Sequence, residues 1–500
     1  MNGEKRMRRI VIAGGGTAGW MAAAAIARTL GRTVDVTLVE SDAIGTIGVG
    51  ESTIPPLVTY NRLLNINEAE FMRATQATFK LGIMFDNWKE QGHNYFHSFG
   101  LTGKDHWSAG FWHFWLYGRE KGHEQSYDDY CLELIAAREG KFAHLPDDRM
   151  NYAYQLDSGL YAKFLRGMAE GDGTRRVEGK ISTVNLDGET GEIAALVLDS
   201  GERIEGDLFL DCTGFRAVLI GQTLGVGHED WTHWLPCDSA IALQTESVGP
   251  AVPYTRAIAH DAGWQWRIPL QSRVGNGIVY CSRYLDQDTA MERLLGNIEG
   301  EVLTKPNILR FGAGMRKKQW HRNCVAIGLS GGFMEPLEST SIHLIQRAVL
   351  RLIRMLPLGK TSERDVAEFN DQQITDMLQI RDFLILHYKA TERTDSEFWR
   401  YCKSMPIPDT LEQKIELFRE AGLVFRKNEE LFVENSWVQV MMGQGIMPQT
   451  HHPIAEKLTN EELARFLATI RDTVAKTVKS LPEHAAYVSR YCGIARAAAA

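Results

Sequence analysis

The sequence lacks several features that would identify common classes of protein. None of its apolar stretches reaches the roughly 18 residues that a transmembrane helix needs, so we expect no membrane span. It has no block of lysine and arginine, and its formal net charge is −8, so we expect no nucleic-acid partner. It also has no internal repeat and no low-complexity linker, which predicts interleaved parts within one body.

Cysteine is present but without a pattern. The seven cysteines are scattered and odd in number, and no two of them form a C-x-x-C pair. A disulfide framework or a zinc site would show pairs, so we expect reduced thiols and a cytoplasmic location. The adjacent His451 and His452 suggest a metal, but further ligands at a suitable spacing are missing, and we expect no metal site.

The composition is that of a soluble globular protein, with 44% hydrophobic and 24% charged residues. A basic cluster from Lys5 to Arg9 before an apolar stretch superficially resembles a signal peptide. The glycines within that stretch fit a nucleotide-binding turn better, and we favour that interpretation.

A strand, a glycine turn and a helix are predicted in order near the N-terminus. Residues 9–13 are apolar, the turn from Gly14 through Gly16 to Gly19 matches G-x-G-x-x-G, and an alanine-rich helix is predicted over residues 20–30. The glycines, with Thr17 and Ala18 between them, let the backbone approach a pyrophosphate at the start of a helix. A second predicted strand ends at Glu40, about 20 residues further on, where a carboxylate can bind a ribose hydroxyl.

Two later segments favour FAD over NAD as the dinucleotide. LFLDCTGF (residues 208–215) and RNCVAIGLSGG (residues 322–332) both predict a buried strand that leaves through a glycine turn. Such distant returns suit a long flavin cofactor. We therefore predict an α/β fold with a discontinuous Rossmann-like FAD-binding domain of the flavin monooxygenase type.

Three further segments carry residues that could do chemistry. TIGVGESTIPP (residues 46–56) predicts backbone close to a flat ligand, although a surface loop with a capping box stays open. In EPLESTS (residues 335–341), Glu338 precedes two hydroxyls and a predicted helix, and these residues could simply cap that helix. Lys80 lies in an apolar run, where a lysine could merely extend its amine to the surface.

The motif GWQWRIP (residues 263–269) places two tryptophans at strand spacing. Trp264 and Trp266 would lie on one side of a strand, and read alone they are best interpreted as core.

Taken together, these motifs resemble the flavin-dependent tryptophan halogenases. The resemblance runs from GGGTAGW (14–20) to the GQG segment at 443–445. The pairing of GWQWRIP with EPLEST distinguishes this family from ordinary flavin hydroxylases; GVGESTIP (48–55) and Lys80 in FKLGIMFDNW are further markers.

The resemblance implies a mechanism. Reduced flavin (FADH2), supplied by a separate NAD(P)H-dependent flavin reductase, and O2 would oxidise chloride or bromide to hypohalous acid. The acid would pass through a tunnel to Lys80 and halogenate an electron-rich aromatic ring, with Glu338 assisting and Ser339 as a relay. An ammonium can hydrogen-bond hypohalous acid, and a carboxylate can accept the ring proton.

The resemblance also implies roles for further residues. The flavin contacts would be Ala18, Ser41, Ile44, Val49, Ser52, Leu329 and Ile342; the halide site Thr340 and Ser341; the substrate contacts His97, Phe99 and Phe432; and the wall between flavin and substrate Trp264, Trp266 and Pro269.

Two departures from the family pattern bear on halide and substrate. Ser341 stands where the family usually has glycine, although its backbone N–H could still serve. Residues 419–445 are shorter than the lid of members that act on free tryptophan, and Leu431 and Phe432 replace a Tyr-Tyr pair. We therefore expect an indole-like or larger aromatic substrate rather than free tryptophan.

The predicted organisation is a halogenase body over residues 1–338, with interleaved substrate-side segments at about 60–200 and 215–320, and a mainly helical substrate-binding lobe over 339–500. Two other functions stay open: a flavin-dependent aromatic hydroxylase and a flavin-binding protein without turnover. A homodimer also stays open.

Overall fold

The computed structural model describes residues 9–44, 50–106, 108–356 and 361–493. The chain divides into two compact units that are each assembled from three segments. The first contains Met1–Gln76, Leu156–Asp238 and Arg310–Leu378, and the second contains Ala77–Gln155, Ser239–Leu309 and Gln379–Ala500. The cofactor motifs and the lysine motif therefore belong to different units. The boundary that we placed at residue 338 stays a prediction.

The first unit is built on a six-stranded sheet with the strand order β20-β21-β12-β1-β2-β8. All its neighbouring pairs are parallel except β20 with β21, and the central strands β1 and β12 are apolar except at one end, Arg9 and Asp211, because both faces of the sheet are buried. This confirms the predicted Rossmann-like α/β fold. The strands are β1 (Arg9–Ala13), β2 (Asp35–Glu40), β8 (Arg175–Glu178), β12 (Leu208–Asp211), β20 (Trp320–His321) and β21 (Cys324–Ala326).

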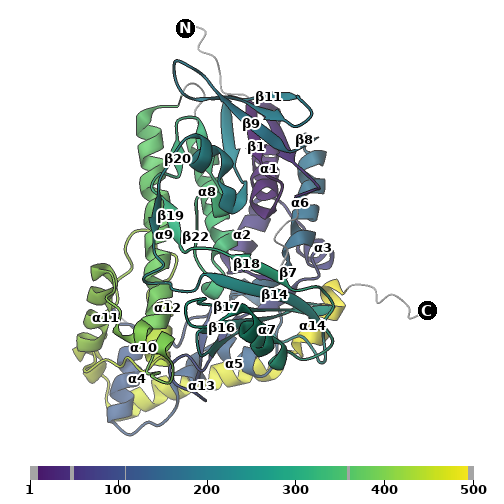
Figure 1. Ribbon diagram of the computed structural model, residues 1–500. Coiled ribbons are helices and arrows are strands. Elements are labelled where there is room, and N and C mark those ends of the chain that lie inside the picture. Colours follow the sequence, from purple (N-terminus) through teal and green to yellow (C-terminus); the bar gives the residue numbers. More distant parts are fainter. Residues whose placement is uncertain (1–8, 45–49, 107, 357–360, 494–500) are drawn as a thin grey trace, which may run out of the picture. The chain divides into compact units, whose positions relative to one another are not determined.

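Helix α1 (Thr17–Leu30) packs beside α6 (Ser158–Gly171) and α8 (Ser341–Met355) in this unit (Figure 1). Its alanines from Ala22 to Ala25 are fully buried, and their small side chains allow close packing. The helix begins at Thr17, three residues before the predicted start, because it follows the glycine turn without a linker.

The smaller elements of the first unit are α2 (Pro56–Leu63), α3 (Glu68–Ala74), the strands β9 (Ile181–Leu186), β10 (Ile193–Leu198) and β11 (Arg203–Glu205), and the strands β13 (His228–Asp230), β19 (Gly314–Arg316) and β22 (Gly332–Phe333). Strand β3 (Gly50–Ser52) lies in the GVGESTIP motif.

The second unit is built on a seven-stranded sheet with the order β18-β14-β17-β16-β15-β5-β6. Strand β6 stands at one edge, and β15 pairs in parallel with β5. The strands are β5 (Gly82–Asp86), β6 (Asn94–Ser98), β14 (Ser239–Glu246), β15 (Thr255–His260), β16 (Gly263–Pro269), β17 (Arg273–Tyr280) and β18 (Asn307–Arg310). In a separate small sheet, β4 (Thr78–Lys80) pairs with β7 (Ala153–Asp157).

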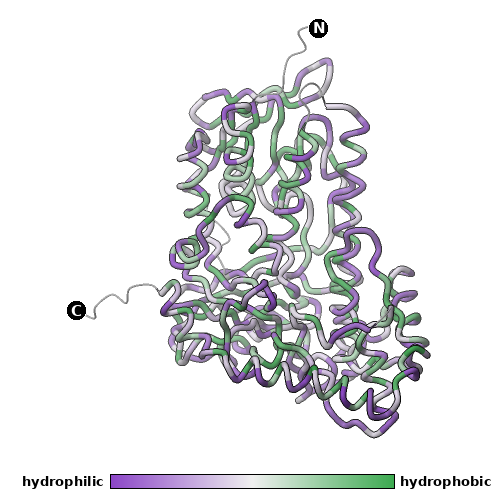
Figure 2. Tube along the Cα trace, turned by 180° about the vertical axis from the view of Figure 1, so that it is seen from behind, coloured by the Kyte–Doolittle hydropathy of each residue, from purple (hydrophilic) through white to green (hydrophobic). Residues whose placement is uncertain are grey.

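Helices dominate the chain after residue 340, as predicted. The later helices are α9 (Glu363–Lys389), α10 (Glu397–Ser404), α11 (Asp409–Ala421), α12 (Glu434–Gly443), α13 (Asn460–Ser480) and α14 (His484–Cys492); α4 (Phe111–Glu120), α5 (Leu132–Arg138) and α7 (Gln287–Gly296) come earlier. Hydrophobic and hydrophilic residues alternate along many of the helical turns (Figure 2), as one-sided burial requires. Within the described ranges, none of the helices is long and apolar enough to cross a membrane.

Candidate active site

The glycine turn of the first unit has the geometry of a dinucleotide cradle. Gly14 has a φ of +107°, and a Cβ there would lie 2.3 Å from the carbonyl oxygen of Cys212. A Cβ on Gly19 would lie 1.9 Å from the carbonyl oxygen of Gly14, so α1 can approach β1 only with glycine there. A Cβ on Gly16 would meet open space, which leaves room for a ligand at the start of α1. These residues fit a dinucleotide cofactor.

Glu40 lies beside this turn, as predicted. Its Oε2 occupies the space that a Cβ on Gly15 would need. Its carboxylate accepts hydrogen bonds from Arg176 (2.6 Å) and from the indole nitrogen of Trp20 (3.3 Å). These partners orient the carboxylate of Glu40. It is held next to the pyrophosphate cradle, where it could accept a hydrogen bond from a ribose hydroxyl.

The distant segment around Gly328 returns to the same turn. A Cβ on Gly328, whose φ is +73°, would lie 2.9 Å from the Cβ of Ala18. Ser330 hydrogen-bonds the carbonyl oxygen of Asp211, so the segment is also tied to the end of β12. The two segments predicted to bind flavin, which the sequence separates by some three hundred residues, thus meet, and Leu329 lies partly buried between Gly328 and Ser330.

Asp211 has a structural role. Its buried carboxylate accepts hydrogen bonds from the hydroxyl and N–H of Thr213 and from the N–H groups of Leu219 and Ile220. Asp211 therefore shapes the turn after β12, and both of its carboxylate oxygens already accept hydrogen bonds from the chain itself.

The loop before α8 buries the predicted acid and hydroxyls. Glu338 is fully buried, and Ser339 and Thr340 are 4% and 2% exposed. Ser339 has a φ of +60°, a left-handed conformation that is unusual for serine and redirects the chain into α8 at Ser341. Ile342, a predicted flavin contact, is buried in the first turn of this helix.

The GVGESTIP segment is only partly described. Val49 lies outside the described residues. Ser41 and Ser52 are partly buried, whereas Ile44 is 50% exposed. Burial and the nearby Asp157 raise the pKa of Glu51 to about 7, so this carboxyl is poised to titrate near neutrality.

Lys80 is the last residue of β4 in the second unit, and its side chain is fully buried. Its Nζ lies 5.0 Å from the ring centroid of Phe99, within cation–π distance. A backbone hydrogen bond of 2.9 Å from the N–H of Phe99 to the carbonyl of Leu81 sets this proximity. The structure thus brings two predicted site residues together, and Lys80 does not extend to the surface.

A buried histidine fixes the strand that carries Lys80. His484 accepts a hydrogen bond from the N–H of Phe79 (3.2 Å), and its other ring nitrogen lies 2.7 Å from the carbonyl oxygen of Ala251. Burial lowers the pKa of His484 to about 4, so it is neutral near pH 7. No sequence motif indicated this support.

His97 and Phe432, both predicted substrate contacts, meet at a third ring. The ring of Phe383 lies 5.4 Å from that of His97 and stacks at 3.7 Å on that of Phe432. His97 and Phe432 are both buried, at 2% and 5% exposure. Phe99 is only partly buried, so it is the member of the predicted trio with surface left for a ligand.

The tryptophan motif forms β16, as its spacing predicts. The rings of Trp264 and Trp266 are 6.2 Å apart, and that of Trp266 covers Gly277, where a Cβ would lie 2.0 Å from it. The indole N–H of Trp266 is buried and has no hydrogen-bond acceptor among the described residues. Pro269 is the buried last residue of the strand. The motif therefore builds a rigid aromatic surface with an unused donor.

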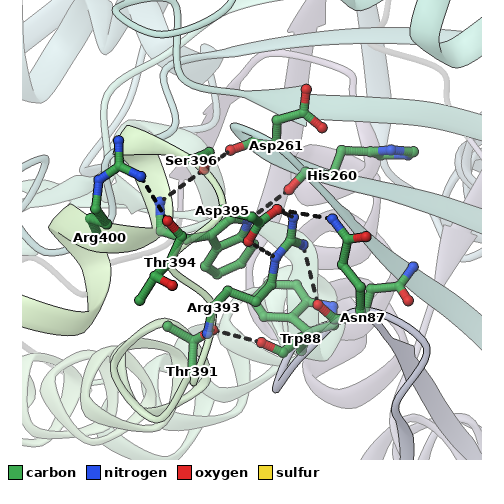
Figure 3. Close-up of polar contacts among 12 residues, drawn as sticks. Asn87, Trp88, His260, Asp261, Thr391, Arg393, Thr394, Asp395, Ser396 and Arg400 are labelled. Atoms are coloured by element: carbon green, nitrogen blue, oxygen red, sulfur yellow. Dashed lines mark hydrogen bonds and ion pairs between the residues drawn. The ribbon is translucent and has the colours of Figure 1, made fainter.

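A polar cluster around Arg393 and Asp395 lies next to Trp88 (Figure 3). The ring centroid of Trp88 lies 6.5 Å from that of Trp264, and the indole N–H of Trp88 donates a hydrogen bond to the carbonyl of Ala257. Arg393, whose side chain is 3% exposed, binds Asp395 with two hydrogen bonds and donates to the carbonyl of Asn87. These bonds lower the pKa of Asp395 to about 2, so the pair stays charged and holds the segment of Trp88 in place.

The lid segment between α11 and α12 uses one buried acid internally. Glu430 is 2% exposed, and its Oε1 accepts hydrogen bonds from Lys414 (2.7 Å) and from the indole N–H of Trp437 (2.9 Å). Glu434 accepts a hydrogen bond from the N–H of Arg426. Both oxygens of Glu430 are therefore occupied by its own chain, whereas Glu434 gives one oxygen to a single backbone N–H.

His451 lies between Glu120 and Glu456, at 2.9 Å and 3.3 Å. In the part of the chain that the structure describes, groups of three or more side chains suited to a metal are absent. The seven cysteines, all within the described ranges, are buried and form no disulfide.

A family model described as "Tryptophan halogenase" matches residues 9–460. Among curated proteins, the 7-chloro-L-tryptophan 6-halogenase KtzR of Kutzneria sp. (strain 744) is 35% identical over 97% of this chain and 100% of its own length. The tryptophan 6-halogenase SttH of Streptomyces toxytricini is 34% identical, covering 96% and 97%.

Solved structures give the same family. Xcc4156, a flavin-dependent halogenase from Xanthomonas campestris, superposes with a TM-score of 0.97 at 60% identity, covering 98% of this chain and 99% of that one. BrvH, a flavin-dependent halogenase from Brevundimonas sp. BAL3, has a TM-score of 0.93 at 43% identity, with 97% and 99% covered.

Proposed function

From the premise that this chain belongs to the tryptophan halogenase family, we propose that Lys80 and Glu338 direct hypohalous acid onto an indole-like ring. The family membership makes the chain a flavin-dependent halogenase, an oxidoreductase that uses FAD and halide. The observation that carries the finer proposal is the full burial of Lys80 against the partly open ring of Phe99.

The first unit supplies the residues that would hold the flavin. Gly14, Gly16 and Gly19 form the cradle, Glu40 stands at the ribose position, and Gly328 brings Leu329 to the same turn. Reduced flavin, when bound, supplies the oxidising chemistry with O2 and halide. Thr340 and the N–H groups at the start of α8 offer a halide hydrogen bonds and the positive end of a helix dipole. Serine in place of the family's usual glycine at position 341 adds a side chain but keeps the backbone N–H, which could still donate to the halide.

Lys80 would hold the hypohalous acid. An ammonium donates a hydrogen bond to the hydroxyl oxygen, which makes hydroxide a better leaving group as the ring attacks the halogen. The face of Phe99 stabilises the cation without neutralising it. Glu338 would accept the proton that the ring loses, Ser339 would relay the acid, and the surface of Trp264 and Trp266 would separate flavin from substrate.

The substrate is proposed to be indole or a larger aromatic without a free amino-acid group. Recognition of an ammonium needs an available carboxylate, and the buried Glu430 of the lid is bound by Lys414, Lys427 and Trp437 of its own chain. His97 and Phe432 would shape the pocket together with Phe383, while Phe99 would contact the ring directly. The reduced flavin would come from a separate NAD(P)H-dependent reductase.

Mass spectrometry of indole incubated with the protein, FAD, NADH, bromide and a flavin reductase tests the function. We expect a product with the bromine isotope pattern. A gain of one oxygen would instead indicate a hydroxylase, and the absence of product with bound flavin would indicate a flavin-binding protein. Both outcomes would reject the proposal.

Lys80→Met tests the role of the lysine, because methionine nearly matches its apolar length and leaves little cavity. We expect flavin oxidation to continue and halogenated product to fall by more than 100-fold. The matched control is Lys104→Met, since Lys104 is exposed in the same unit. Product formation at more than a tenth of the wild-type rate in Lys80→Met would show that Lys80 does not direct the halogen.

A further inference from the structure

We infer that Asn435 and Gln439 are positioning residues, which hold the strand segment of Phe99 in the one register that sets its ring against Lys80. This inference rests on the proposed function of Lys80. It concerns the segment from Ser98 to Thr102, which continues β6 at the edge of the seven-stranded sheet.

The inner edge of this segment faces β5. The N–H of Phe99 donates to the carbonyl of Leu81, and Ser98 pairs with Gly82. Because successive residues of a strand point their backbone groups to opposite edges, Ser98, Gly100 and Thr102 turn theirs outward. That outer edge has no further strand in the sheet.

Two side-chain amides of α12 take the place of the missing strand. The N–H of Ser98 donates to Oε1 of Gln439 (2.8 Å), and the N–H of Thr102 donates to Oδ1 of Asn435 (3.1 Å). Both amide nitrogens donate back to the carbonyl of Gly100, at 2.9 Å from Asn435 and 3.2 Å from Gln439. Gln439 also donates to the hydroxyl of Thr102 (3.0 Å).

The arrangement specifies a register rather than mere coverage of an edge. An apolar helix face would cover β6 equally well, but it would leave buried N–H groups unsatisfied at a cost of about 1–3 kcal/mol each. A slip of one residue would bring the backbone groups that face β5 toward the amides and would reverse the side of the strand on which Phe99 lies. Asn435 and Gln439 are four residues apart, so they share one face of α12.

The same helix also binds the lid segment. Trp437 lies between the two amides in sequence and points to another side of α12, where its N–H binds Glu430 of the lid that carries Phe432. A carboxyl oxygen of Glu133 also occupies the space beside Gly100, 1.7 Å from where a Cβ would stand. Helix α12 thus fixes the Phe99 segment and the lid relative to each other.

Gln439→Met tests the inference, because it removes the amide while nearly keeping the side-chain length. The matched control is Gln444→Met, since Gln444 is also buried and its amide donates to a backbone carbonyl, that of His387. The readouts are the melting temperature, halogenated product per flavin oxidised, hypohalous acid captured by a soluble trap, and hydrogen exchange at the N–H groups of Ser98 and Thr102.

We expect Gln439→Met to oxidise flavin at the wild-type rate, to lose product at least tenfold, and to release more trappable hypohalous acid. Amide exchange at Ser98 should accelerate, whereas Gln444→Met should keep wild-type coupling at a similar melting temperature. Equal loss of coupling in both variants, or wild-type coupling in Gln439→Met, would overturn the inference.

The outcome is distinguishable from a failure of the proposed function. If the wild type halogenates no aromatic substrate, the proposed function fails and the catalytic purpose assigned to the two amides fails with it. If the wild type halogenates and exchange at Ser98 is unchanged by Gln439→Met, only the positioning role is refuted.

Discussion

At the scale of single residues, the chain places polar groups where burial or backbone conformation makes them costly. Lys80 and Glu338 are fully buried, and Ser339 adopts a left-handed conformation between Glu338 and the helix that follows. Such features persist in proteins when the surrounding structure enforces them, and they concentrate at functional sites. The sequence motifs identified these three positions.

The left-handed conformation of Ser339 predicts an order of stability between two variants. Ser339→Gly and Ser339→Ala both remove the hydroxyl, but only glycine adopts a φ of +60° without steric strain. We expect the glycine variant to be more stable than the alanine variant by about 1 kcal/mol in denaturant unfolding. Equal stabilities would show that the loop relaxes; loss of product in both variants would support a role for the hydroxyl.

The buried Glu133 predicts a pH dependence of stability. Burial raises its pKa to about 7, against the opposing hydrogen bond from the N–H of Asn151. The folded state therefore holds a proton that the unfolded chain releases above about pH 4.5. This group's stabilising contribution is full below that pH and is lost as the pH rises through 7.

Glu133→Gln removes this titration and keeps the acceptor for Asn151. We expect the variant to gain stability relative to the wild type by about 2–3 kcal/mol between pH 5 and pH 8, measured by urea unfolding. A stability difference that stays constant over this range would mean that Glu133 is ionised in the folded protein.

At the scale of elements, helix termini and strand edges are held by specific side chains. Helix α13 begins with a reciprocal capping box: Thr459 accepts from the N–H of Glu462, whose carboxylate accepts from the N–H of Thr459. Strand β4 is held by His484 and the segment after β6 by α12, and these supports join parts of the chain that are far apart in sequence.

Thr459→Ala should destabilise the protein by about 1 kcal/mol, because it leaves N–H groups at the start of α13 without an acceptor. The control is Thr469→Ala on the exposed middle of the same helix, where alanine also has the better helix propensity. Thermal or urea unfolding of both variants gives the comparison. A loss in Thr459→Ala no larger than in Thr469→Ala would show that the cap contributes nothing measurable.

At the scale of the whole molecule, the two units divide the proposed reaction. The dinucleotide cradle and Glu338 belong to the first unit, and Lys80, Phe99 and the tryptophan motif belong to the second. Each unit is closed by segments from three parts of the chain, so neither half of the reaction corresponds to a continuous stretch of sequence.

Two substitutions should separate the half-reactions. Gly14→Ala should weaken flavin binding by at least tenfold, because a Cβ would collide with the carbonyl of Cys212. Gly173→Ala is its control: Gly173 has a similar φ of +101° in the same unit, and a Cβ there meets open space. Lys80→Met should bind flavin normally and fail only in halogenation.

Flavin titration followed by absorbance measures both effects. Normal flavin affinity in Gly14→Ala would place the cofactor elsewhere, and weak affinity in Lys80→Met would mean that the lysine acts on the flavin rather than on the oxidised halogen.

The sequence by itself determined the local features of this protein. The glycine turn, the strand that ends at Glu40, the tryptophan strand and the cap of α13 follow from residue types at short spacing, because backbone conformation and helix capping depend on neighbours within a few residues. Its motifs also sufficed to identify the family. Tertiary structure alone decided that Phe99 meets Lys80, that Glu430 is used by Lys414 and Trp437, and that two amides of α12 replace a strand at β6. These contacts join residues up to several hundred positions apart, and no short-range pattern encodes which distant partner satisfies a buried polar group.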